Sequence, residues 1–342
     1  MSDSQNKTAS LTNKSSSTQG LEKAQKNPIS SKTKVKKSKA KNKAKKTVVD
    51  IYQMVTDKII HALDNGVKPW ACPWDRTQEF GQLPLNFKTQ NHYSGINILL
   101  LWSETVDKGY SSPYWLTFNQ VKEMGGNVIK GNKSTQLVFY KPWERENAEG
   151  ETEIIPMLKP FNVFNLDQIE GIEKPAVKPN IALVEKSGFV ENKNAENVIS
   201  GTGIKIHHSG NQAFYRPSTD EITMPPKELF NHSDNYYSTI LHEITHATGH
   251  KKRLDRSMAG RFGSSDYAFE ELIAELGSAF SCAELGIFGN GETQHACYIA
   301  SWLKKLNEDK KFIFQAAASA AKAHRWIFKV EINNGKEVKK VA

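Results

Sequence analysis

Three residues that could hold and use a metal ion, His242, Glu243 and His246, lie in the segment HEITH of the C-terminal half. Apolar residues around this segment recur at helical spacing, which predicts a helix over 235–250. Residues four apart on a helix lie about 40° apart around its axis, so both imidazoles can reach one cation. Glu243 then stands beside them, where it can act as a general base on water. An HExxH pattern also arises by chance, but the helical context favours a zinc-protease type of site.

A site of this type needs a third ligand and one open position. The continuation HExxHxxGxxH is excluded, because Lys252 stands where the last histidine is required. His250 lies on a neighbouring face of the helix, where a histidine facing the helix dipole is the simpler interpretation. The other candidates are three carboxylates on the next expected helix: Glu270, Glu271 and Glu275.

Glu271 and Glu275 are four residues apart and share one helix face. This spacing resembles the gluzincin pattern, in which the first glutamate binds the metal and the second acid orients a ligand imidazole. We therefore expect Glu271 as the third ligand, Glu275 as the orienting acid and Glu270 in solvent. The alternative, in which all three glutamates lie on the surface, stays open.

Length and composition bound the class of protein. The 342 residues suffice for two domains and a tail, and the longest apolar run, 96–102, is far shorter than the roughly 18 residues of a membrane span. The N-terminus has no apolar stretch of the kind that secretory signals contain. Three scattered cysteines argue against a disulfide framework and a thiolate metal site, so we expect a cytoplasmic protein.

The positive charge is concentrated at the N-terminus. The net charge is +9, but residues 1–48 contain thirteen lysines against two acids, so the remaining chain is slightly negative. Residues 1–47 lack the apolar side chains that folding needs, and we expect a disordered basic tail. Such a tail could bind DNA phosphates without reading bases, or it could serve only as a solubilising or targeting segment.

The rest of the chain is expected to have an α+β fold in two domains. Helical patterns begin at Val49 and again at 96 and 115, while 136–143 and 161–166 have strand composition. The second half contains a strand at 204–208, a hairpin at 213–225 whose edge could pair with a peptide, and four helices at 235–250, 265–285, 293–308 and 313–328. Tyr215 and Tyr267 are candidates for oxyanion contacts or for core packing. The expected ranges are 1–47 tail, 48–172 first domain, 173–190 linker, 191–332 second domain and 333–342 C-terminal tail.

Across both domains the chain resembles the ArdC family of antirestriction proteins of conjugative plasmids and other mobile elements. Segments such as NHYSGINILLLW and PFNVFNLDQIEG are similar in the first domain, which also accompanies TraC-type primases; AFYRPSTDEITMP, YYSTILHEITHATGHKKRLDR and FGSSDYAFEELIAEL are similar in the second. The resemblance implies a single-stranded-DNA-binding domain followed by a zincin-like, gluzincin-type metallopeptidase domain. It also implies that His242, His246 and a glutamate of EELIAE hold the metal, with Glu243 as general base.

The DNA-binding role falls on the first domain, which is rich in aromatic residues but holds sixteen acids and twelve bases over 49–174. Rings that stack on bases and lysines that contact phosphates are the usual means of binding single strands. We expect Trp102 and Phe118 in the core, and 125–134 as a loop that contacts the DNA backbone. The expected exposed rings are Trp70, Trp74 and Tyr93, and the expected phosphate contacts are Lys88, Lys122, Lys130, Lys133 and Lys141.

These patterns favour an antirestriction protein that binds single-stranded DNA, with double-stranded DNA as the alternative partner, and protects incoming DNA from host restriction. Zinc is the expected cofactor, with Mn²⁺ as another possibility, and no membrane partner is expected. One alternative is an active zinc protease that its DNA-binding domain localises, with a host restriction component as substrate. The other is a DNA-binding protein with a catalytically idle metal site.

Overall fold

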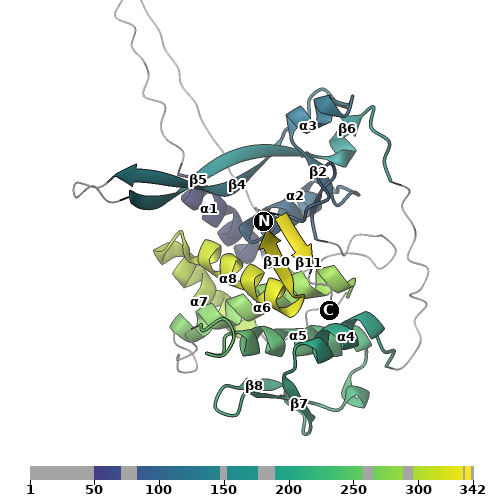
Figure 1. Cartoon of the computed structure of the whole chain (residues 1–342), viewed down its shortest axis with the longest axis vertical. Helices are drawn as coiled ribbons and strands as arrows, with labels where there is room; N and C mark the ends of the chain where they lie inside the picture. The colour runs from purple at the N-terminus through teal and green to yellow at the C-terminus, as the bar shows by residue number, and fades with distance from the viewer. Residues whose placement is uncertain are drawn as a thin grey trace, which may run out of the picture. The chain divides into compact units, whose positions relative to one another are not determined.

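A long β-hairpin dominates the first half of the chain (Figure 1). Its strands β4 (Thr135–Glu146) and β5 (Thr152–Asn165) pair antiparallel along the whole of β4, from Thr135 opposite Val163 to Glu146 opposite Thr152. β5 also pairs with β2 (Tyr114–Leu116), which pairs with β1 (Leu85–Asn86), so the sheet order is β1-β2-β5-β4. The computed structural model describes residues 50–70, 83–146, 152–175, 189–256, 265–287, 296–333 and 336–339.

Three helices accompany this sheet, and their ends follow local signals. α1 (Ile51–Asp64) begins at Asp50, whose carboxylate accepts a hydrogen bond from the Gln53 amide at 3.2 Å. α2 (Ile96–Lys108) ends at Gly109, which adopts a left-handed conformation with φ +64°. α3 (Phe118–Glu123) begins after a capping box of Thr117 and Gln120. Short strands β3 (Asn127–Val128) and β6 (Ile169–Glu170) pair beside it, next to the 3₁₀ turn η1 (Leu166–Gln168).

The expected helix from residue 115 is therefore wrong at its start. Trp115 pairs with Asn86 on β1 and with Asn165 on β5, which holds this segment in an extended conformation. The cap at Thr117 then sets the first helical residue. Sheet pairing with residues 29 and 50 positions away overrides the local apolar pattern.

The second half combines a small sheet with a helical layer (Figure 1). β7 (Lys205–His208) pairs parallel with β9 (Glu221–Met224), and β8 (Phe214–Arg216) pairs antiparallel with β9, as the expected hairpin requires. β10 (Val330–Asn333) and β11 (Lys336–Lys339) pair antiparallel, and they extend from the end of the expected second domain into the expected C-terminal tail. The remaining elements are α4 (Lys193–Gly201), η2 (Lys227–Leu229), α5 (Ser233–Thr248), α6 (Ser265–Leu285), α7 (Ala296–Glu308) and α8 (Phe312–Ile327).

One hydrophobic core contains residues from both halves of the chain. Leu99 of α2 and Leu137 of β4 belong to the same buried cluster as Leu272 of α6 and Trp302 of α7. The Thr56 hydroxyl also donates to the Lys310 carbonyl at 2.9 Å. A second cluster joins α5 to the sheet through Ile222 and Met224. The mixture of helices and strands confirms the predicted α+β fold, while the domain boundaries stay a prediction.

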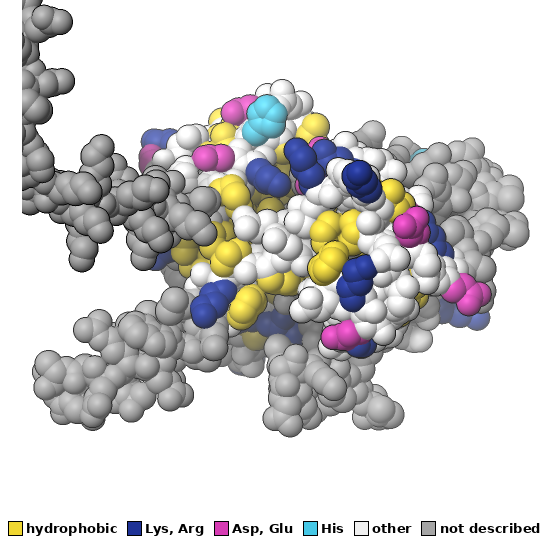
Figure 2. Space-filling view, turned by 90° about the horizontal axis from the view of Figure 1, so that it is seen from above, with side chains coloured by type: hydrophobic (Ala, Val, Ile, Leu, Met, Phe, Trp, Pro, Cys, Tyr) yellow, Lys and Arg dark blue, Asp and Glu magenta, His cyan; other side chains and the backbone are white. Residues whose placement is uncertain are grey.

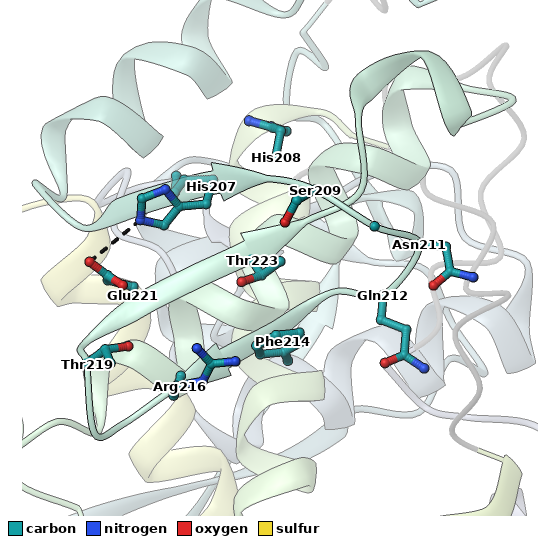
Figure 3. A pocket seen from close by; sticks show the side chains of 12 residues that line it. His207, His208, Ser209, Asn211, Gln212, Phe214, Arg216, Thr219, Glu221 and Thr223 are labelled. Carbon is teal, nitrogen blue, oxygen red and sulfur yellow. Dashed lines mark ion pairs between the residues drawn. The ribbon is translucent and has the colours of Figure 1, made fainter.

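The three-stranded sheet has two different faces. Ile222 and Met224 of β9 are buried, while the alternate residues Glu221 and Thr223 line an open groove of about 780 Å³ (Figure 3). Phe214 and Arg216 of β8 line the same groove. The groove therefore lies on the face of the sheet opposite α5. Each helix in the described part of the chain is too short or too polar to cross a membrane.

Candidate metal centre

Helix α5 brings its two histidines together on one side. Its apolar residues Tyr237, Ile240 and Ile244 are fully buried, which fixes the rotation of the helix in the core. The rings of His242 and His246 lie 4.8 Å apart, and their Nε2 atoms are separated by 3.1 Å. Both imidazoles thus direct the same nitrogen at one point, as the helical spacing predicts.

Helix α6 adds the carboxylate of Glu271 at that point. Its oxygens lie 3.6 Å from the Nε2 atoms of His242 and His246. Donor atoms about 2.0–2.2 Å from one tetrahedral ion are roughly 3.3–3.6 Å apart. In the described part of the chain, these three residues form the one group of such side chains close enough to hold an ion. Their separations and chemistry fit a divalent metal.

The charges around His242 favour a cation. Burial opposes the charged imidazole, but the hydrogen bond with Glu271 and the charges of Glu243, Glu275 and Glu271 raise the pKa of His242 to about 9. Burial likewise opposes ionisation of Glu271, yet the hydrogen bond with His242 and the nearby imidazoles lower its pKa to about 2. The site therefore stabilises positive charge inside the protein.

A close approach of the two helices makes this arrangement possible. Gly277 of α6 packs directly on Thr245 of α5: a Cβ atom at Gly277 would lie 2.4 Å from Thr245 Cγ2. Thr245 is fully buried, and its hydroxyl donates to the Leu241 carbonyl at 2.7 Å, so it has little room to move. Because Gly277 has no side chain, α6 can lie near enough to α5 for Glu271 to reach both histidines.

Glu243 lies beside the histidines and is also held from the sheet. It is buried, and its Oε2 accepts a hydrogen bond from the backbone amide of Tyr215 on the edge strand β8 at 2.8 Å. The Tyr215 hydroxyl instead donates to Asp220 at 2.8 Å, so this side chain fixes the β8–β9 turn. His250 Nδ1 lies 3.7 Å from the same Asp220.

Of the other two candidate glutamates on α6, Glu270 lies in a different environment from the one expected. The expectation that Glu270 faces solvent is wrong, because Glu270 is 7% exposed and its Oε1 lies 3.3 Å from His246 Nδ1. Glu275 is half-buried; burial raises its pKa, while His242 and Lys68 oppose that shift. Tyr267 lies beside Glu271: burial and hydrogen bonds with Tyr298 and Glu271 raise the pKa of Tyr267. The roles of Glu271 as ligand and Glu275 as orienting acid stay predictions.

The expected DNA-contacting rings lie in different environments. Trp70 is 3% exposed and packs edge-to-face on Trp302 with ring centroids 5.7 Å apart, so its prediction as an exposed ring is wrong. Tyr93 is half-buried, and its hydroxyl accepts from Asn86 at 3.3 Å. Trp74 lies outside the described residues. Trp102 is buried as expected, but Phe118 is 49% exposed, so its prediction as core is also wrong.

The expected phosphate contacts are exposed where the structure describes them. Lys130 and Lys133 lie between β3 and β4, and Lys122 of α3 stands over the Phe118 ring at 5.7 Å. Lys88 forms an ion pair with Glu123. The side chain of Lys141 lies outside the described residues. Seen from above, Figure 2 shows basic and acidic side chains among hydrophobic ones on this side of the molecule.

Two further exposed rings, Phe139 and Tyr140 on β4, belong to the aromatic-rich first half but were not among the expected contacts. Their exposure follows from the tertiary structure, because β4 and β5 extend beyond the short strand β2 that pairs with the end of β5. There the hairpin is a two-stranded ribbon, in which Phe139 is 44% and Tyr140 is 51% exposed.

Comparison with known proteins finds a different family for each half of the chain. Residues 49–164 match the family described as the N-terminal domain of anti-restriction factor ArdC, and residues 193–319 match the zincin-like metallopeptidase family. The protein y4eC of Sinorhizobium fredii (strain NBRC 101917 / NGR234) is 37% identical over 82% of this chain and 92% of its own length. DNA primase TraC of Escherichia coli is 37% identical over 82% of this chain, which corresponds to only 20% of TraC.

Solved structures of the antirestriction ArdC protein from the R388 plasmid are similar over nearly their whole length. The metal-free structure has a TM-score of 0.69 and 41% identity over 81% of this chain and 96% of that one. The Mn(II)-bound structure has a TM-score of 0.70 and 40% identity over 82% of this chain and 97% of that one. The chain therefore belongs to the ArdC family of antirestriction proteins, with a zincin-like domain after its ArdC N-terminal domain.

Proposed function

We propose that this protein binds single-stranded DNA through its first half, protects incoming DNA from host restriction in the cytoplasm, and carries a divalent-metal centre of hydrolytic type. The observation that carries the hydrolytic part is the buried Glu243 beside three converging donors on His242, His246 and Glu271. A purely structural metal site has no use for such a carboxylate. Zinc and manganese both suit these donors.

The chain's own residues have distinct parts in this chemistry. A bound divalent ion supplies Lewis acidity toward a carbonyl and lowers the pKa of water. His242, His246 and Glu271 would hold it. Glu243 would take a proton from the attacking water and return it to the leaving amine. The Tyr215 amide supports this role, because it holds Glu243 Oε2 and so sets the orientation of the carboxylate.

Replacing Glu243 with glutamine should keep the metal and abolish hydrolysis. The amide has nearly the shape of the carboxylate but cannot accept a proton, and positioned general bases contribute about 10²- to 10⁴-fold in rate. Metal content, cleavage of host restriction components and protection of transferred DNA in cells are measured for Glu243→Gln and wild type. Protection that survives without cleavage would exclude the alternative of a protease that DNA binding only localises. Loss of protection with metal retained would support that alternative.

The proposed DNA contacts lie on α3 and the loop that follows β3. Phe118 is exposed at the start of α3, and Lys122, one turn later, stands over the same ring. Exposed Lys130 and Lys133 follow. The Gln168 side chain donates to the Lys133 carbonyl at 2.9 Å, which fixes the backbone of this loop. A fixed aromatic surface among cations is the arrangement that suits bases stacked along a single strand.

Removing these contacts should weaken binding in two distinguishable ways. Phe118→Ala should lower affinity for single-stranded DNA by about tenfold, since one stacked base is worth about 1–3 kcal/mol. Lys130→Ala with Lys133→Ala should reduce the salt slope by about 1.4, because each phosphate contact contributes about 0.7 for single strands. Fluorescence anisotropy with labelled oligonucleotides at several salt concentrations measures both effects.

Matched variants in the second half provide the controls. Leu229→Ala removes an apolar side chain that is even more exposed than Phe118, and Lys205→Ala removes an exposed lysine; neither should change binding. Deletion of residues 1–46 tests the proposed phosphate-binding tail, and duplex DNA tests strand preference. Equal affinity of wild type and the Phe118 and lysine variants would remove this surface from the proposal.

A further inference from the structure

We infer that the buried pair of Arg256 and Glu270 positions His246 for metal binding by holding its Nδ1 side. The inference rests on the proposed metal centre, and it assigns a role to two residues outside the donor set. Glu270 directly precedes the expected ligand Glu271, so α6 contributes two adjacent carboxylates to opposite sides of the same imidazole.

The contacts form a continuous chain from Arg256 to the donor atoms. Arg256 donates to both oxygens of Glu270, from Nη2 at 2.7 Å and from Nε at 3.1 Å. Glu270 Oε1 lies 3.3 Å from His246 Nδ1, and His246 Nε2 lies 3.6 Å from Glu271. The side chains of Glu270, Arg256 and His246 are only 9%, 11% and 12% exposed. Water therefore has little access to this chain of contacts.

This geometry selects one form of the imidazole. A carboxylate at Nδ1 can only accept, so it favours the tautomer with hydrogen on Nδ1 and a lone pair on Nε2. That lone pair faces His242 and Glu271, where the ion would lie. A carboxylate in this position also raises the basicity of the ligand nitrogen. Glu270 thus prepares His246 for a cation without touching it.

Arg256 in turn fixes Glu270 relative to α5. Its Nη1 donates to the Thr248 hydroxyl at 2.7 Å, and its Nη2 donates to the Thr245 carbonyl at 2.8 Å. Both acceptors belong to the helical turn that carries His246. The guanidinium therefore holds the carboxylate of α6 against the same turn of α5, and it balances the negative charge that burial would otherwise penalise.

A second ion pair nearby, Arg253 with the half-buried Asp220, makes it possible to distinguish positioning of a ligand from a general stabilisation of helix packing. Arg253 is bonded to Asp220, and its Nε donates to the Ala247 carbonyl at 2.6 Å. This pair also ties a neighbouring segment to the end of α5, but its contacts reach Tyr215 and His250 rather than His242 or His246. If the Arg256–Glu270 pair only held the helices together, loss of either pair would have the same effect on stability and on metal affinity.

The test compares Glu270→Gln with the matched variant Asp220→Asn. Affinities of the metal-free proteins for Zn²⁺ and Mn²⁺ are measured by competition with a chromogenic chelator, visible spectra are recorded with Co²⁺, and thermal unfolding is followed without metal. We expect Glu270→Gln to lower affinity 10- to 100-fold and to shift the Co²⁺ spectrum, since partners of ligand imidazoles have effects of this size. Asp220→Asn should destabilise the metal-free protein without either change.

Arg256→Lys provides a second variant in case Glu270→Gln folds poorly. Lysine keeps the charge but not the paired donors, so it should lower metal affinity in the same direction. An affinity and spectrum of Glu270→Gln equal to those of Asp220→Asn would overturn the inference. Failure of the wild-type protein to bind any of the three ions would instead overturn the proposed metal centre itself.

Discussion

Replacing Glu271 with glutamine should leave the protein without stoichiometric metal. Glu271 would supply the one negatively charged donor, 3.6 Å from both imidazole nitrogens, and an amide oxygen is a much weaker ligand for zinc. We expect affinity to fall by more than about 100-fold, beyond the range for partners of ligands. Elemental analysis and chelator competition on purified protein measure the loss.

Thermal unfolding provides a second measure of the same loss. A ligand at about 100 times its Kd stabilises the native state by about 2.7 kcal/mol, so added zinc should raise the Tm of wild type but not of Glu271→Gln. Glu275→Gln is the matched control on the same helix, one turn away, and should retain stoichiometric metal. Full zinc content in the Glu271 variant would refute its assignment as the third ligand.

Replacing Gly277 with alanine should destabilise the protein and weaken metal binding together. The added Cβ would lie 2.4 Å from Thr245 Cγ2 and 2.8 Å from its hydroxyl oxygen, so α6 must move away from α5. Overpacking of a dense core costs about 1–3 kcal/mol. The same movement would carry Glu271 away from the histidines. Chemical denaturation of the metal-free protein and zinc affinity measure the two effects.

Two companion variants separate the clash from a general effect of alanine. Gly201→Ala places a Cβ near only the Lys329 amine at 3.8 Å, so it should change neither stability nor metal affinity appreciably. Thr245→Ala removes both clashing atoms, so in combination with Gly277→Ala it should restore much of the lost metal affinity. Normal zinc affinity in Gly277→Ala alone would show that the close helix approach is not required.

Much of the metal helix and its surroundings could be predicted from local patterns. The expected helix at 235–250 corresponds to α5 at Ser233–Thr248, and the expected helix at 265–285 has the same bounds as α6. Helical spacing is a property of consecutive residues, so it also places His242 and His246 on one side. Sequence similarity over both halves likewise indicates the ArdC family without coordinates.

The assignment of the glutamates on α6 could not be predicted in the same way. The spacing of Glu271 and Glu275 indicates a shared helix face, but it does not show which neighbour stands at which acid. The structure places Glu270 at His246 Nδ1 for two reasons. Helix α6 approaches α5 closely at Gly277, and Arg256, in the segment that follows α5, donates hydrogen bonds to Glu270. These contacts join residues 14 to 32 positions apart.

Exposure in the first half likewise depended on distant contacts. Trp70 has the local signs of a loop residue, yet it is buried against Trp302, which is 232 positions later in the chain. Phe118 follows an apolar pattern, yet it is exposed as the first residue of α3, directly after the cap at Thr117. The sequence by itself determined the metal helix, most of the α+β elements and the family, because these depend on local spacing and similarity. Only the tertiary structure decided which carboxylate and which ring faces which neighbour, because burial and hydrogen bonding are set by segments that meet only when the chain folds.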